Sequence, residues 1–88
     1  SLPTTFTPNG DDHNDVISVK GWGLKELLEF KVYDRWGQEL FSTQDVDEGW
    51  DGYFKGVLQN NDVYVYKVRA LTWRDEIKSL EGYFNLMR

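Results

Sequence analysis

Apolar and polar residues alternate with a period of two along most of this chain. Such alternation is typical of half-buried β-strands. Leu28, Phe30 and Val32 are expected on one face of their strand, and Tyr64, Tyr66, Val68, Ala70 and Thr72 on one face of a later strand. The strands that we expect cover residues 16–20, 28–33, 38–43, 63–73 and 77–87, and short links rich in Gly, Asn and Asp separate several of them. Only residues 24–28 could be helical, and five residues form a turn at most. The pattern therefore predicts an all-β fold.

The length of 88 residues allows one small domain with a thin core. Six or seven short strands at this length favour an immunoglobulin-like antiparallel β-sandwich, with a small barrel as the alternative. No apolar run is long enough to span a membrane, so we expect no membrane insertion. The chain lacks an initiator Met and a secretory signal, which indicates that residues 1–88 are an excerpt from a larger protein.

The charge and composition exclude several classes of function. The net charge is −5, and acidic residues cluster at 11–15 and at 45–51, whereas a nucleic-acid-binding protein needs a basic surface. The absence of Cys removes disulfides and thiolate chemistry. His13 is the single histidine and lies in a polar run typical of an exposed turn. We therefore expect neither an enzyme nor a nucleic-acid partner.

Four tryptophans have two interpretations. Trp36 and Trp50 each lie beside a turn glycine, where a large ring can close the open end of a thin core, so we expect both to be buried. Trp22 and Trp73 are expected to be partly exposed. In the alternative interpretation, the tryptophans form an aromatic platform for sugar rings, as in a carbohydrate-binding β-sandwich module of a secreted enzyme.

Several segments match, in order, the motifs of one known family. They are residues 6–16 (FTPNGDDHNDV), 32–37 (VYDRWG) followed by 40–41 (LF), 50–52 (WDG), 62–67 (DVYVYK) and 82–88 (GYFNLMR). On these motifs the chain resembles the gliding-motility-associated C-terminal domain, which is the type B sorting domain of type IX secretion. Asp12 departs from the usual glycine of the first motif, and Phe84 from the usual valine of the last.

The resemblance implies a function in protein transport. Domains of this family end large secreted or surface proteins, fold in the periplasm as immunoglobulin-like sandwiches and are recognised by the type IX machinery of the outer membrane. They leave the cell with the cargo protein that precedes them in the same chain, and the cargo can stay attached to the cell surface.

The last predicted strand, residues 77–88, is our candidate for the recognised element, because an edge strand offers unpaired backbone groups to another β-protein. Within it the predicted binding residues are Gly82, Tyr83, Phe84, Leu86 and Arg88. The alternative is that this strand only completes the sheet.

The loop from Asn9 to Asp15 is a candidate calcium site. Asn9, Asp11, the carbonyl group of His13, and Asp15 follow one another at every second residue, and calcium prefers six to eight oxygen ligands. Against this, no bidentate Glu follows at the distance typical of an EF-hand. The alternative is an Asx-turn whose side chains bind only their own backbone.

Overall fold

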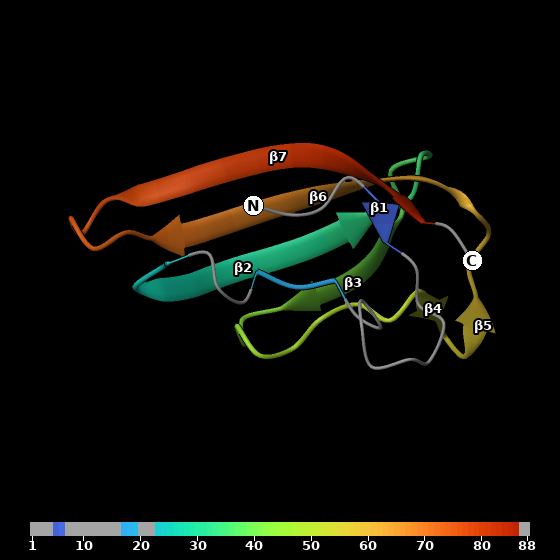
Figure 1. The fold of residues 1–88 in the computed structure, drawn as a ribbon, viewed down its shortest axis with the longest axis horizontal. Coiled ribbons are helices and arrows are strands. Elements are labelled where there is room, and N and C mark those ends of the chain that lie inside the picture. Colours follow the sequence, from blue (N-terminus) through green and yellow to red (C-terminus); the bar gives the residue numbers. More distant parts are fainter. Residues whose placement is uncertain (1–4, 7–16, 20–22, 87–88) are drawn as a thin grey trace.

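The structure, a computed structural model, describes residues 5–6, 17–19 and 23–86, and all of the regular secondary structure in these ranges is β (Figure 1). The strands are β1 (Thr5–Phe6), β2 (Glu26–Tyr33), β3 (Glu39–Thr43), β4 (Tyr53–Phe54), β5 (Val57–Leu58), β6 (Asp62–Leu71) and β7 (Ile77–Leu86). The predicted all-β class is confirmed. The strands β2, β3, β6 and β7 also begin and end within two residues of the bounds that the sequence predicts.

The main sheet has the strand order β1-β7-β6-β2-β3. All neighbouring strands are antiparallel except β1 and β7, which run parallel. The long strands β2, β6 and β7 lie side by side in Figure 1 and form the body of the domain. The order β7-β6-β2-β3 is that of strands G, F, C and C′ in immunoglobulin variable-type domains.

A second layer covers one face of this sheet. Ile17 and Trp50 form an antiparallel bridge, in which each backbone N–H donates to the carbonyl oxygen of the other residue, at 2.8 and 2.9 Å. The hairpin of β4 and β5 forms a separate two-stranded sheet. Ile17, Val19 and Trp50 are almost completely buried and belong to the same apolar cluster as the inner face of the main sheet. The two layers make the immunoglobulin-like sandwich that the sequence predicts.

The inner face follows the predicted alternation, with one correction. In β6 and β7 the residues turned to the core are Tyr64, Val68, Ala70, Phe84 and Leu86. In β2 we expected Leu28 on this face, but Leu27 is buried there and Leu28 is half-buried. The pairing of β2 with β6 shifts between Leu27 and Glu29, and such a bulge inserts one residue and reverses the alternation before it.

Trp50 is the largest fully buried side chain, as predicted. Its ring centroid lies 5.1 Å from that of Tyr64 and 6.0 Å from that of Phe84, so it joins the second layer to β6 and β7. The indole Nε1–H donates a hydrogen bond of 2.9 Å to the carbonyl oxygen of Tyr53. Burial therefore leaves the polar atom of this ring satisfied.

Tyr64 adds a feature of immunoglobulin-like domains that the alternation in the sequence does not indicate. Its hydroxyl donates a hydrogen bond of 2.7 Å to the carbonyl oxygen of Asn60, four residues upstream. A tyrosine at the start of strand F that binds upstream backbone in this way is the tyrosine corner of immunoglobulin folds. It holds the segment that leads from β5 into β6.

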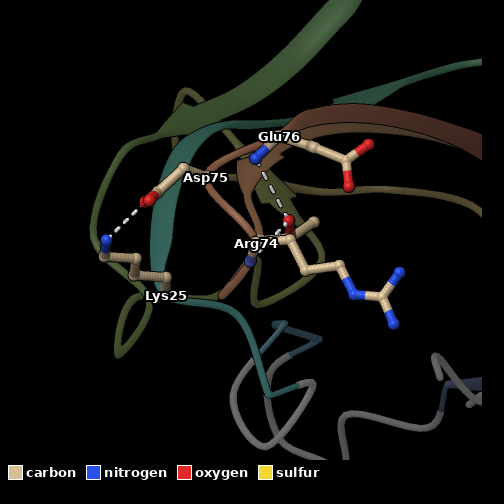
Figure 2. A network of polar contacts seen from close by, with 5 residues as sticks. Lys25, Arg74, Asp75 and Glu76 are labelled. Atoms are coloured by element: carbon tan, nitrogen blue, oxygen red, sulfur yellow. Dashed lines mark hydrogen bonds and ion pairs between the residues drawn. The ribbon is translucent and has the colours of Figure 1, made fainter.

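The turn from Thr72 to Glu76 joins β6 to β7 and is closed by its first side chain (Figure 2). The Thr72 Oγ1 atom accepts hydrogen bonds from the backbone N–H groups of Arg74 and Glu76. Asp75 has a φ of 60°, and its backbone N–H donates to the Thr72 carbonyl oxygen. Lys25, just before β2, forms an ion pair with the Asp75 carboxylate and ties this turn to the neighbouring strand.

Candidate functional site

The turn between β2 and β3 has the same hydrogen-bond pattern and lies at the other end of the sheet. The Asp34 Oδ1 atom accepts hydrogen bonds of 2.9 Å from the backbone N–H groups of Trp36 and Gln38. The backbone N–H of Gly37 donates to the Asp34 carbonyl oxygen, and Gly37 has a φ of 87°. A type I turn followed by a residue in the left-handed region closes a three-residue hairpin loop, which explains the glycine.

Trp36 lies at the tip of this turn, and 83% of its surface is exposed. The prediction that it is buried is wrong. The adjacent glycine indicated the turn correctly, but the tip extends beyond the last paired residues of β2 and β3 and no described part of the second layer covers it. Four hydrogen bonds fix this turn, and the turn holds the Trp36 ring in the solvent.

Arg35 joins the exposed indole to the sheet. Its guanidinium carbon lies 5.3 Å from the centroid of the Trp36 ring, within the range of a cation–π contact. Its Nη1 atom lies 3.6 Å from the Asp62 Oδ2 atom at the start of β6. One face of the indole is thus covered by a cation that is itself tied to the neighbouring strand.

A hollow of about 240 Å³ lies between this turn and the outer face of β6 and β7. Its lining residues are Tyr33, Asp34, Arg35, Gly37, Val65, Lys67 and Glu81. The Lys67 Nζ atom lies 5.1 Å from the centroid of the Tyr33 ring, and in the described part of the chain no carboxylate is within ion-pair distance of it. The hollow therefore combines the Tyr33 ring with two basic side chains, Arg35 and Lys67, and two acidic ones, Asp34 and Glu81.

The predicted recognition strand contains both core and surface residues. Phe84 and Leu86 are buried, so their side chains hold the sandwich together and are not available to a partner. Tyr83 is 71% exposed on the outer face, where it pairs with Val65 of β6. Gly82 is partly buried. Arg88 lies outside the described residues.

In the part of the chain that the structure describes, one side of β7 is unpaired along most of its length. β1 pairs with it at Asn85 and Leu86, and no other described residue pairs with that side. On its other side, β7 pairs with β6 over ten consecutive residues without a bulge. A long, regular strand with one free side is suited to pairing with a strand of another protein.

The predicted calcium ligands Asn9, Asp11, His13 and Asp15 lie outside the described residues. Within residues 5–6, 17–19 and 23–86, no three acidic or histidine side chains gather closely enough to hold a metal ion. In the same ranges no helix has the length and apolar character needed to cross a membrane.

The exposed tryptophans do not share a surface. Trp73 is 71% exposed, as expected, but it lies in the turn between β6 and β7, whereas Trp36 lies in the turn between β2 and β3 at the opposite end of the sheet (Figure 1). Strands of eight and ten residues separate the two turns by roughly 25–30 Å. The described tryptophans therefore form no common platform for a sugar chain. Trp22 lies outside the described residues.

Fold and surface together define a small immunoglobulin-like β-sandwich with an exposed aromatic and charged site on its outer face. A family model, described as the CHU_C type IX secretion signal domain, matches residues 1–86. The chain belongs to this family. No solved structure matches it.

This membership confirms the function that the sequence motifs indicate, which is a sorting signal for type IX secretion. The family is one of secretion signals and not of enzymes. The signal implies contact with the type IX machinery, a cargo, and export across the outer membrane.

Proposed function

We propose that this domain folds in the periplasm, is recognised as a folded unit by the outer-membrane component of the type IX machinery, and leaves the cell with its cargo in the same chain. The match of the family model over residues 1–86 carries this proposal. The fold supports recognition of the folded unit, because the motif residues Trp50, Tyr64 and Phe84 are buried and cannot be contacted unless the sandwich opens. The cargo then arrives at the cell surface or in the medium.

The recognised surface in this proposal includes β7 and the segment that follows it. Tyr83 presents an exposed ring there, and the open side of the strand presents backbone groups. We assign recognition to Tyr83, Arg88 and the backbone near Gly82, and we assign Phe84 and Leu86 to the support of that surface.

A reporter fusion tests the function. Residues 1–88 are placed behind a fluorescent protein that is directed to the periplasm of a host with type IX secretion. We expect fluorescence outside the cell in this host and only in the periplasm of a secretion-null strain. A reporter that stays periplasmic in both strains would contradict the proposed function.

Two variants of the fusion test the recognised strand. Tyr83→Ala and deletion of Arg88 alter exposed or terminal groups, so each should change stability by less than about 0.5 kcal/mol. We expect both to reduce the exported fraction while thermal melts stay close to the parent. Normal export of both variants would show that neither Tyr83 nor Arg88 is recognised, and would leave only the backbone of β7 as the recognised part of this strand.

A further inference from the structure

The two hairpin turns of the main sheet differ in what surrounds their tryptophans. Both turns are closed by the side chain of their first residue, and both expose an indole. Of these two indoles, only Trp36 has a guanidinium stacked on its ring, and its chain neighbours Arg35 and Gly37 line a hollow. Trp73 itself lines a hollow, together with Arg74 and Lys78, but no cation of the described residues lies over its ring.

Trp36 is organised like an anchor residue of a protein interface. Tryptophan, tyrosine and arginine dominate the binding energy of such interfaces. A ring in a fixed turn also loses little freedom on binding. Together the exposed parts of Trp36 and Tyr83 supply roughly 300 Å² of aromatic surface. That is a substantial share of the ~800 Å² that each partner contributes to a standard interface.

The charges around the hollow indicate the partner's chemistry. The Asp34 carboxylate is engaged by two backbone N–H groups, whereas Lys67 has no ion-pair partner in the described residues and Arg35 has only the 3.6 Å contact with Asp62. Glu81 also lines the hollow, from β7. The two acidic and two basic side chains of the lining balance in formal charge, and Glu81 is the cross-strand neighbour of Lys67. The Lys67 ammonium and the Arg35 guanidinium nevertheless keep N–H groups that no described carboxylate accepts at hydrogen-bond distance, and a carboxylate is their complement.

We propose that the 34–38 turn and the adjacent hollow form a docking anchor for a protein that presents an indole-sized apolar pocket with a carboxylate at its rim. This inference rests on the proposed function, because the partner is then the outer-membrane machinery that reads the signal. Trp36 enters the pocket, and Arg35 and Lys67 face the carboxylate. Tyr83 extends the contact toward β7.

The test measures binding of the labelled 88-residue domain to outer membranes from a type IX-competent host, after subtraction of binding to membranes from a secretion-null strain. We expect Trp36→Ala to weaken specific binding by about 30-fold or more, as loss of a hot-spot residue does. Trp73→Ala is the matched control, because it removes an equally exposed indole from the turn at the other end, and it should stay within about twofold of the parent. Lys67→Gln should weaken binding by up to about fivefold, as loss of a rim charge does, and more at low salt.

Three results would overturn the inference. Equal binding of the parent and the Trp36→Ala variant would show that Trp36 is not an anchor, and would not contradict the proposed sorting function. Specific binding that survives protease treatment of the membranes would identify a glycan or lipid as the partner in place of a protein. Absence of specific binding by the parent would contradict the proposed function, and this inference with it.

Discussion

Tyr66 of β6 lies directly opposite Gly82 of β7, and its ring fills the space that a side chain at position 82 would need. A methyl group on Gly82 would lie 2.6 Å from the Tyr66 Oη atom and less than 3 Å from two ring carbons. Tyr66 packs against the core, so its ring cannot move away freely. The glycine of the final sequence motif is therefore explained by packing between two strands.

Gly82→Ala should destabilise the domain by roughly 1–3 kcal/mol, because it overpacks the Tyr66 ring. Urea and thermal melts measure this change. In a Tyr66→Ala background the same substitution should cost much less, since the clash is gone. An equal cost in both backgrounds would contradict this explanation.

Trp50→Ala should cost roughly 3–5 kcal/mol, because it leaves a cavity between Tyr64 and Phe84. Trp36→Ala should cost less than about 1 kcal/mol, because it removes only an exposed ring and its contact with Arg35. The two variants are compared by denaturant unfolding. Similar losses of stability would show that Trp36 packs against the sandwich in solution.

Tyr64→Phe should lower stability by about 0.5–1.5 kcal/mol, because the hydrogen bond to the Asn60 carbonyl oxygen is lost while the ring stays in place. Urea unfolding gives the difference. Tyr83→Phe is the control, because that ring is largely exposed, and it should have no measurable effect. If Tyr64→Phe were equally neutral, the tyrosine corner would contribute nothing to stability.

Lys31 should titrate above its ordinary pKa of 10.5, because a hydrogen bond to Glu39 and the charges of Glu29 and Glu39 favour the ammonium form. Because the pKa of Lys31 is higher in the folded state than in the unfolded state, the interactions of its ammonium group stabilise the fold. This stabilisation is complete below pH 10.5 and is lost as the pH rises through the folded-state pKa. An NMR titration of the Lys31 side chain measures it. Glu39→Gln should lower the pKa, and Glu48→Gln, on a distant loop, should leave it unchanged.

Calcium should raise the melting temperature if the loop from Asn9 to Asp15 binds it. A dissociation constant of about 10⁻⁴–10⁻³ M, typical of extracellular calcium modules, gives roughly 1.4–2.7 kcal/mol at 10 mM calcium. For a domain of this size we expect a rise of about 5–20 °C relative to chelator, and Asp11→Asn should abolish it. A melt that calcium does not change would leave the Asx-turn as the explanation.

The strand faces could be predicted because alternation is a local property. Tyr64, Val68 and Ala70 lie every two or four residues along β6 and are all buried. The same rule placed Leu28 in the core wrongly, because the bulge before Glu29 arises from the pairing of β2 with β6. β1 has only two residues and pairs in parallel, so it offers no alternation to read.

The candidate site could be predicted only in part. The alternation along the last strand places Tyr83 on the face opposite Phe84 and Leu86, as observed, whereas the turn glycine beside Trp36 wrongly predicts a buried ring. Residues Asp34 and Gly37 indicate a tight turn in the sequence, whereas the exposure of the indole between them depends on how far the second layer reaches. That is a property of the whole sandwich.

The parallel pairing of β1 with β7 has a mechanical consequence. Thr5 lies beside Asn85 and Phe6 beside Leu86, so the first and last described strands are neighbours that run in the same direction. If the chain before β1 is pulled while the chain after β7 is held, the hydrogen bonds between β1 and β7 are loaded in shear. These hydrogen bonds must then break together and not one after another. A force that pulls this domain and its cargo apart from opposite ends is therefore resisted by all of the β1–β7 hydrogen bonds at once.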